Sequence, residues 1–249
     1  MKKMILLLTI LVGCSVLGMA ENCEEKYFWS DMPEKEMFLG MLVVENDLEC
    51  LKYFIDIKGL DLNKAEVEKG TTLINKVFKY YNPQILPETL SFIIKHGIKP
   101  TNKDMADIFF RLNSKLIVEN SQVILTEPML YEKFKLLTKE GGPDVWKAID
   151  DDTVNWIINQ SVNYNDIGTY YIKLLLDCGL PLSEYNRYIN AVKKRIEGEK
   201  DLAKIETGKQ IIQLLEQSRE SRIQEMTEKI KKTVNEIEIR RMEKYNYSF

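Results

Sequence analysis

Residues able to do chemistry are few in this chain of 249 residues. His96 is the only histidine, and the sequence places no nucleophile or acid beside it, so a role in acid–base catalysis is not indicated. Glu206-Thr207-Gly208-Lys209 looks like part of a phosphate-binding loop. That loop needs glycine where Ala203 stands and Ser or Thr where Gln210 stands. We therefore predict no catalytic residue, no enzyme activity and no cofactor.

Metal and nucleic-acid chemistry are not indicated either. Asp150-Asp151-Asp152 offers three carboxylates, but no calcium-loop spacing follows, and acids in this place favour the start of the next helix. The chain has no C-x-x-C pair, which argues against zinc when only one histidine is present. A net charge of -3 argues against nucleic acid as a partner. We expect no metal site.

Residues 1–20 have the layout of a secretory signal, with a basic start, an uncharged stretch and small residues near the end. One cleavage site follows Ala20. Another precedes Cys14, because residues 11–14 (Leu-Val-Gly-Cys) resemble the bacterial lipobox, whose cysteine is acylated. We favour lipidation of Cys14, which would anchor the chain in the cell envelope. Cleavage after Ala20 would give a periplasmic or secreted protein, and a retained N-terminal anchor is the remaining alternative.

The mature chain would begin with a tether over residues 21–35 and would retain Cys23, Cys50 and Cys178. Export permits a disulfide, and three thiols leave at least one unpaired. Cys50 and Cys178 fall in or at the end of predicted helices. We expect free buried cysteines, with a Cys23–Cys50 disulfide as the alternative.

Hydrophobic periodicity predicts an all-α body over residues 36–198. Gly59, Gly97, Gly141 and Gly179 lie 38, 44 and 38 residues apart, and each follows an apolar helical run. Glycine in this place supplies the left-handed residue that ends a helix. A recurring unit of two helices is typical of a helical-hairpin solenoid. Residues 116–125 are the one segment that fits helix or strand.

Residues 61–102 resemble an ankyrin repeat. Residues 70–74 (Gly-Thr-Thr-Leu-Ile) are similar to the family's helix-opening Thr-Pro-Leu-His, residues 90–97 to its second helix, and residues 61–63 to the start of its next unit. The resemblance implies a stack of helix pairs that binds partners on the face made by first helices and linkers, here around residues 71–75 and 102–105. A different helical-hairpin solenoid and an irregular all-α domain are the alternatives.

Residues 199–249 predict one long charged helix. Ile223, Met226, Ile230 and Ile237 follow three- and seven-residue steps, and Glu-to-Lys/Arg pairs four residues apart support the helix. So narrow an apolar stripe is typical of a coiled-coil seam, so residues 220–245 are candidates for self-association. A helix folded back on its own body and a single solvated helix are the alternatives.

The sequence therefore predicts an exported, lipid-anchored, ankyrin-like repeat protein that mediates protein–protein interaction at the bacterial cell envelope. The alternative is a structural assembly protein that oligomerises through its C-terminal helix. Neither prediction identifies the protein partner or its contact residues.

Overall fold

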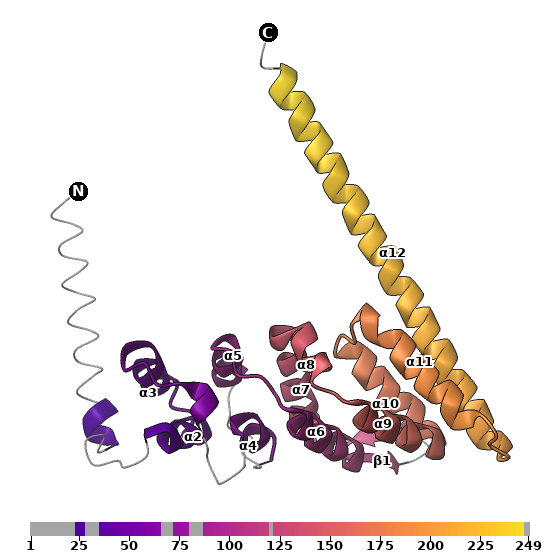
Figure 1. The fold of residues 1–249 in the computed structure, drawn as a ribbon, viewed down its shortest axis with the longest axis horizontal. Helices are drawn as coiled ribbons and strands as arrows, with labels where there is room; N and C mark the ends of the chain where they lie inside the picture. The colour runs from indigo at the N-terminus through magenta and orange to yellow at the C-terminus, as the bar shows by residue number, and fades with distance from the viewer. Residues whose placement is uncertain (1–22, 28–34, 66–71, 80–86, 120–121, 247–249) are drawn as a thin grey trace. The chain divides into compact units, whose positions relative to one another are not determined.

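The computed structural model describes residues 23–27, 35–65, 72–79, 87–119 and 122–246 (Figure 1). The signal segment, Cys14, Ala20 and most of the 21–35 tether lie outside the described residues, as do Gly70 and Thr71. Among the described helices, none is both long and apolar enough to span a membrane.

The described chain is helical except for one hairpin, so the all-α prediction is confirmed at that level. The ambiguous segment is the exception, because it forms strands β1 (Leu116–Glu119) and β2 (Gln122–Leu125), which pair with each other. The chain divides into two compact units, one of residues up to 116 with 125–150, the other of residues 117–124 with 151–249.

The first unit is built from short helical elements. After the helical turn that begins at Cys23 they are α2 (Lys35–Glu45), α3 (Leu48–Lys52), the π-helix η2 (Tyr53–Ile57), the 3-10 helix η3 (Leu62–Lys64), α4 (Leu73–Lys79), α5 (Pro87–Lys95), α6 (Asn102–Ser114), α7 (Pro128–Gly141) and α8 (Pro143–Lys147). Helix α5 packs against α7, and α4 packs against α6. Phe134 of α7 makes edge-to-face contacts with Phe109 and Trp146, and these rings form part of the core.

The second unit is built from α9 (Asp151–Asn163), α10 (Asn165–Asp177), α11 (Leu182–Ile196) and α12 (Leu202–Asn246). The first part of α12 packs on α9, α10 and α11, where Ile211 and Leu215 are fully buried. Gly208 lies against Ile196, and a Cβ on this residue would overlap that side chain. The close approach of α11 explains a glycine inside a long helix, where it otherwise costs about 1 kcal/mol.

Three of the four predicted helix-ending glycines adopt the left-handed conformation, with φ of 72° at Gly59, 87° at Gly97 and 86° at Gly179. At Gly97 the backbone N–H bonds to Ile94 and the next N–H bonds to Ile93, which satisfies two free carbonyls at the helix end. The prediction for Gly141 is wrong by one residue. Gly141 still belongs to α7, and Gly142 takes the positive φ of 60°.

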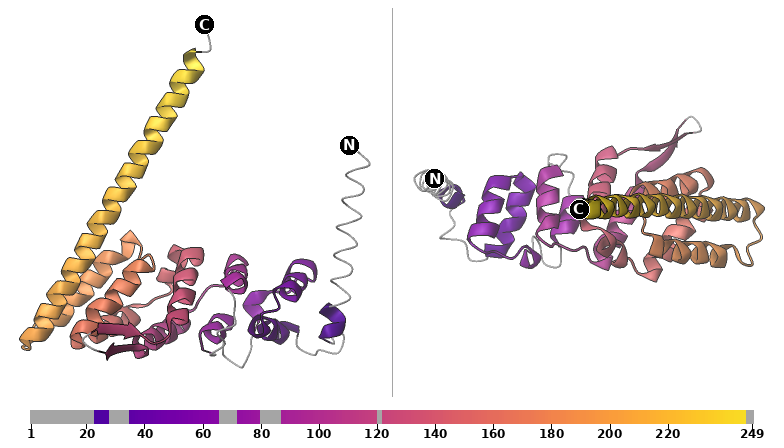
Figure 2. Two further views of the ribbon diagram at one scale, coloured as in Figure 1. Left: turned by 180° about the vertical axis from the view of Figure 1, so that it is seen from behind. Right: turned by 90° about the horizontal axis from the view of Figure 1, so that it is seen from above.

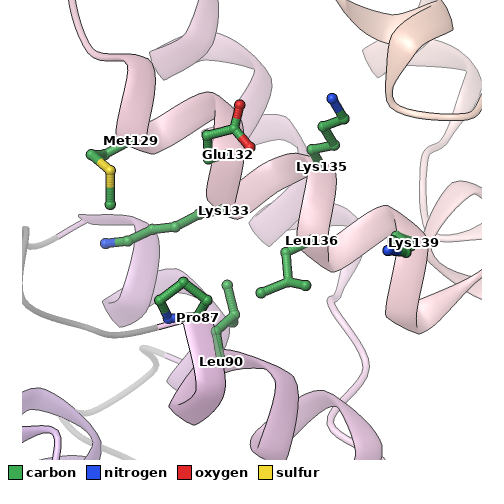
Figure 3. A pocket seen from close by; sticks show the side chains of 8 residues that line it. All are labelled: Pro87, Leu90, Met129, Glu132, Lys133, Lys135, Leu136 and Lys139. Carbon is green, nitrogen blue, oxygen red and sulfur yellow. The ribbon is translucent and has the colours of Figure 1, made fainter.

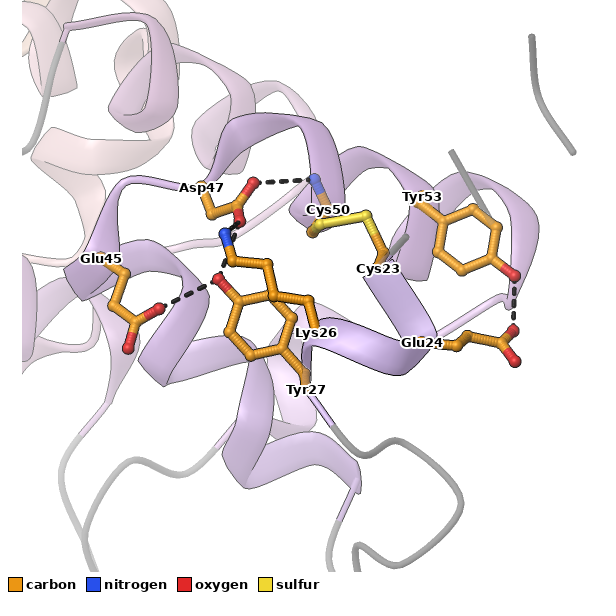
Figure 4. Close-up of a disulfide and its surroundings, with 8 residues drawn as sticks. All are labelled: Cys23, Glu24, Lys26, Tyr27, Glu45, Asp47, Cys50 and Tyr53. Atoms are coloured by element: carbon orange, nitrogen blue, oxygen red, sulfur yellow. Dashed lines mark hydrogen bonds and ion pairs between the residues drawn. A yellow bond between two sulfur atoms is a disulfide. The ribbon is translucent and has the colours of Figure 1, made fainter. Parts of the chain in front are cut away.

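A disulfide joins Cys23 to Cys50 across 27 residues (Figure 4). The expectation of free cysteines is therefore wrong for this pair, whereas Cys178 is a buried thiol outside the disulfide. The sequence favoured free thiols because Cys50 falls in a helix. In the folded chain, Cys50 on α3 lies against the short helical segment that begins at Cys23.

Polar contacts surround this disulfide. Asp47 begins α3 by accepting from the Cys50 N–H at 3.1 Å, and it also accepts from Lys26 and Tyr27 at 2.6 and 2.7 Å. Burial alone would raise the pKa of Asp47, but these hydrogen bonds outweigh it and lower the pKa. The residues that follow Cys23 are thus held to the body by side chains as well as by the covalent link.

Replacing both Cys23 and Cys50 by serine should lower the free energy of unfolding by about 3–4 kcal/mol, because the disulfide restricts a loop of this length in the unfolded chain. Urea unfolding followed by circular dichroism measures the loss.

Reduction of the native protein should give the same loss, and reduction of the double variant should change nothing. Equal stability of the oxidised and reduced native protein would contradict the predicted role of the disulfide.

Candidate functional site

The residues that the sequence offers for chemistry make contacts within the fold. His96 Nδ1 lies 2.9 Å from the Phe92 carbonyl oxygen of its own helix, and Nε2 lies 3.1 Å from Asp56 of η2. The ring also contacts the ring of Phe92. His96 therefore joins two helix ends. Within the part of the chain that the structure describes, no three His, Cys, Asp or Glu side chains converge as metal ligands.

The other two chemical candidates also lie in helical surroundings. Residues 206–209 belong to the interior of α12, where Thr207 is buried and donates to the Ala203 carbonyl, so they form no phosphate loop. Asp151 and Asp152 occupy the first turn of α9, as predicted. Asp151 also accepts from Arg187 of α11 at 2.7 Å.

The predicted contact region around residues 71–75 and 102–105 is occupied by hydrogen bonds between helices. Asp104, 2% exposed, closes a capping box with Thr101 at the start of α6 and accepts from Thr72 Oγ1 at 2.6 Å. Thr72 in turn accepts from the Asn75 N–H and so caps α4. The buried carboxylate thus fixes the starts of α4 and α6 relative to each other, which is a structural role.

The polar side chains beside this network are also paired across helices. Asn75 of α4 donates to Asp107 of α6 at 2.7 Å. Asn102 donates to the Asp150 side chain and accepts from its backbone N–H. These groups lie nearer the surface than Asp104, and they too make hydrogen bonds within the chain.

A shallow groove of about 250 Å³ lies between α5 and α7 (Figure 3). Its lining combines an apolar floor with charged side chains from α7, and the residues are Pro87, Leu90, Met129, Glu132, Lys133, Lys135, Leu136 and Lys139. Burial lowers the pKa of Lys133, although Glu127 opposes that effect. Its ammonium lies 3.4 Å from the Val77 carbonyl in the last turn of α4, where a positive charge is favourable.

Lys133 therefore stabilises the end of α4. Arg111 does the same, because it donates to the neighbouring Phe78 carbonyl at 2.9 Å. With its most buried cation committed to the fold, the groove presents a small apolar floor beside the charged side chains of Glu132, Lys135 and Lys139. At about 250 Å³ it is smaller than the pockets that usually bury a small-molecule ligand.

Among the described residues, the distal part of α12 forms a long exposed surface, and it extends beyond α11 in Figures 1 and 2. The last contacts with the body of its unit are made by Ser218 to Tyr185, by Arg219 to Asn186 and by Arg222 to the Leu180 carbonyl. Every side chain from Ile223 to Glu243 is exposed. We call residues 223–246 the arm, which at 1.5 Å per residue is about 36 Å long.

The arm carries the predicted apolar stripe. Ile223, Met226, Ile230 and Ile237 lie on one helix face, and all four are exposed. Val234 was not part of the predicted stripe, but it lies on the same face. With it, the spacing from Ile223 to Ile237 becomes three, four, four and three residues. At about 100° per residue the five side chains fall within a strip about 80° wide. The arm thus leaves a continuous apolar strip in contact with water.

Replacing Asp104 by alanine should destabilise the protein by about 2–3 kcal/mol, because it removes a buried carboxylate that accepts from Thr72 and Thr101 and closes the capping box of α6. Urea unfolding measures the change.

Replacing Asp107 by alanine is the matched control, because it also breaks a carboxylate contact between α4 and α6, but at an exposed site. Its effect should stay below about 0.5 kcal/mol. Similar losses in the two variants would contradict the structural role given to Asp104.

No protein-family model, curated protein or solved structure matches this chain. Any account of its function therefore depends on its own residues and geometry.

Proposed function

We propose that this chain is an exported, lipid-anchored, ankyrin-like repeat protein that mediates protein–protein interaction at the bacterial cell envelope. The observation that carries the proposal is the arm of α12, whose apolar strip is exposed along its length. Such a strip is stable in water mainly when a partner covers it. By contrast, the residues that the sequence offers for chemistry make contacts with other residues of the chain.

Hydrogen bonds between helices support the repeat part of the proposal. Thr72 pairs with Asp104 over 32 residues, and Arg111 reaches the Phe78 carbonyl over 33 residues. In the second unit Arg195 of α11 pairs with Asn163 of α9 over 32 residues. Contacts between like positions about 32 residues apart are expected of stacked repeats, because each residue meets its counterpart in the next repeat.

The disulfide supports export. Disulfides persist in oxidising compartments such as the bacterial periplasm, and the Cys23–Cys50 pair lies directly after the predicted signal segment. Acylation of Cys14 would place the membrane a few residues before this disulfide. Two or more acyl chains hold a protein stably at a membrane, whereas one does not.

A second candidate function follows from the same arm. The chain would be a structural assembly protein, with the arm as its means of oligomerisation. Deletion of residues 220–249 distinguishes the two functions. Capture of a different protein that survives the deletion belongs to the helical body, whereas loss of self-association assigns assembly to the arm.

Replacing Cys14 by serine should abolish acylation of the protein in its own cells, because the acylated residue is lost. The intact mass of the membrane-extracted native protein should correspond to a chain that begins at an acylated Cys14.

The matched control is replacement of Ala20 by tyrosine, which blocks only cleavage after residue 20 and should leave the native mass unchanged apart from the substitution. A native mass that begins at Glu21 would overturn the lipid anchor while leaving export intact.

A further inference from the structure

We propose that the arm pairs with the arm of a second copy of this chain as a parallel two-stranded coiled coil. This inference rests on the second of the proposed functions and specifies its partner and geometry. Ile223, Ile230 and Ile237 would form layers of the seam, with Met226 and Val234 between them.

The width of the strip favours a helix as the occupant. Five apolar side chains within a strip about 80° wide match the seam of a two-helix contact, whereas a helix buried in a globular core or lying in a lipid surface needs a broader apolar face. Ile223 to Val234 and Met226 to Ile237 are both separations of 11 residues. An 11-residue repeat keeps the strip nearly straight along the helix, so two arms stay in contact over their length.

The charge of the arm favours a copy of itself over a strongly charged partner. Residues 223–246 contain six basic and five acidic residues, so the arm is almost neutral. A nucleic acid or an anionic membrane would select a clear excess of lysine and arginine. Two nearly neutral arms approach each other with little overall repulsion, and their flanks then decide the orientation.

The two flanks of the strip differ in charge. At about 100° per residue one flank carries Glu220, Thr227, Lys231 and Glu238, and the other carries Arg222, Lys229, Thr233 and Arg240. In a parallel pair each flank meets the opposite flank of the second copy, whereas in an antiparallel pair each flank meets its own counterpart. The sign of the contacts therefore depends on direction.

Parallel packing is the better match. It sets Glu238 beside Arg240 of the second copy, at the cost of one lysine contact between residues 229 and 231. Antiparallel packing centred on Ile230 gives equally good apolar layers. However, it sets Glu220 against Glu238 at both ends of the seam, so this flank repels its counterpart.

The body of the second unit leaves the strip accessible. Helix α12 packs on its body through the face that carries Thr207, Ile211 and Leu215. The centre of the strip lies roughly a quarter turn around the helix from that face. In a parallel pair the two bodies would then lie on opposite sides of the seam, so neither blocks the other.

The experiment compares two substitutions in the mature chain by sedimentation equilibrium across about 1–100 µM. The native protein should be a dimer. Ile230→Glu should weaken dimerisation about 100-fold or more, because a charge enters the seam of each copy. Ile239→Glu is the matched control: Ile239 is 56% exposed against 61% for Ile230, but it lies on the opposite face, so the dimer should persist.

A native monomer at all concentrations would overturn the proposal. Equal loss in both variants would also overturn it, because the strip would then have no special role. A native protein that binds anionic vesicles through the arm, and loses that binding with Ile230→Glu without dimerising, would assign the strip to a membrane surface.

Orientation has its own test. Ile237→Cys should form a disulfide between two identical copies under oxidising conditions, because residue 237 faces residue 237 only in parallel packing. Arg240→Glu should weaken the dimer, and adding Glu238→Arg to it should restore dimerisation. Cross-linking only between an Ile237→Cys copy and an Ile223→Cys copy would establish antiparallel packing instead.

These outcomes are separable from the envelope proposal. A dimer with an unacylated N-terminus would retain the coiled coil and reject the lipid anchor. An acylated monomer would retain the lipid anchor and reject the coiled coil.

Discussion

Every described helix before α12 depends on a neighbour to cover its apolar face. The α-helices from α2 to α11 have 5 to 15 residues, a length at which an isolated helix is marginal in water. Their stability must come from packing, as at the contact between α5 and α7 or between α11 and α12. Polar groups enter this scheme only where they fix the relation between helices, as Asp104 does for α4 and α6.

The arm is the exception to that constraint. It has no body to cover it, and its length is supported locally by Glu225 with Lys229, Glu228 with Lys232 and Glu236 with Arg240, whose order suits the helix dipole. Such pairs contribute a few tenths of a kcal/mol each and stabilise a helix without demanding tertiary packing. The sequence thus keeps the arm helical while leaving its apolar strip free for a contact.

Periodicity predicted the helices well because each one repeats an apolar residue every three or four positions. It could not predict the hairpin at residues 116–125, which is too short to give a distinct strand signal. Gly141 and Gly142 are adjacent, so the sequence alone does not say which takes the left-handed conformation. Cys23 and Cys50 are brought together by the turn into α3, a tertiary fact that spacing does not encode.

The strip on the arm was predicted better than the contact region at residues 71–75 and 102–105, for a similar reason. The strip on the arm is a local pattern, so four of its five residues could be found from spacing, and Val234 was missed only because a seven-residue step was expected. Residues 71–75 and 102–105 were assigned to partner binding by resemblance. Their actual contacts, such as Thr72 with Asp104, join helices about 32 residues apart and depend on the folded chain.

The Cys23–Cys50 disulfide has a mechanical consequence for a chain held at its N-terminal end. A pulling force that enters at Cys23 passes directly through the covalent bond to Cys50 in α3, and residues 24–49 between them are bypassed. Lys26, Tyr27 and the start of α3 are therefore shielded from tension. The force reaches the body inside a packed helix, where it must shear many contacts at once instead of peeling the chain away residue by residue.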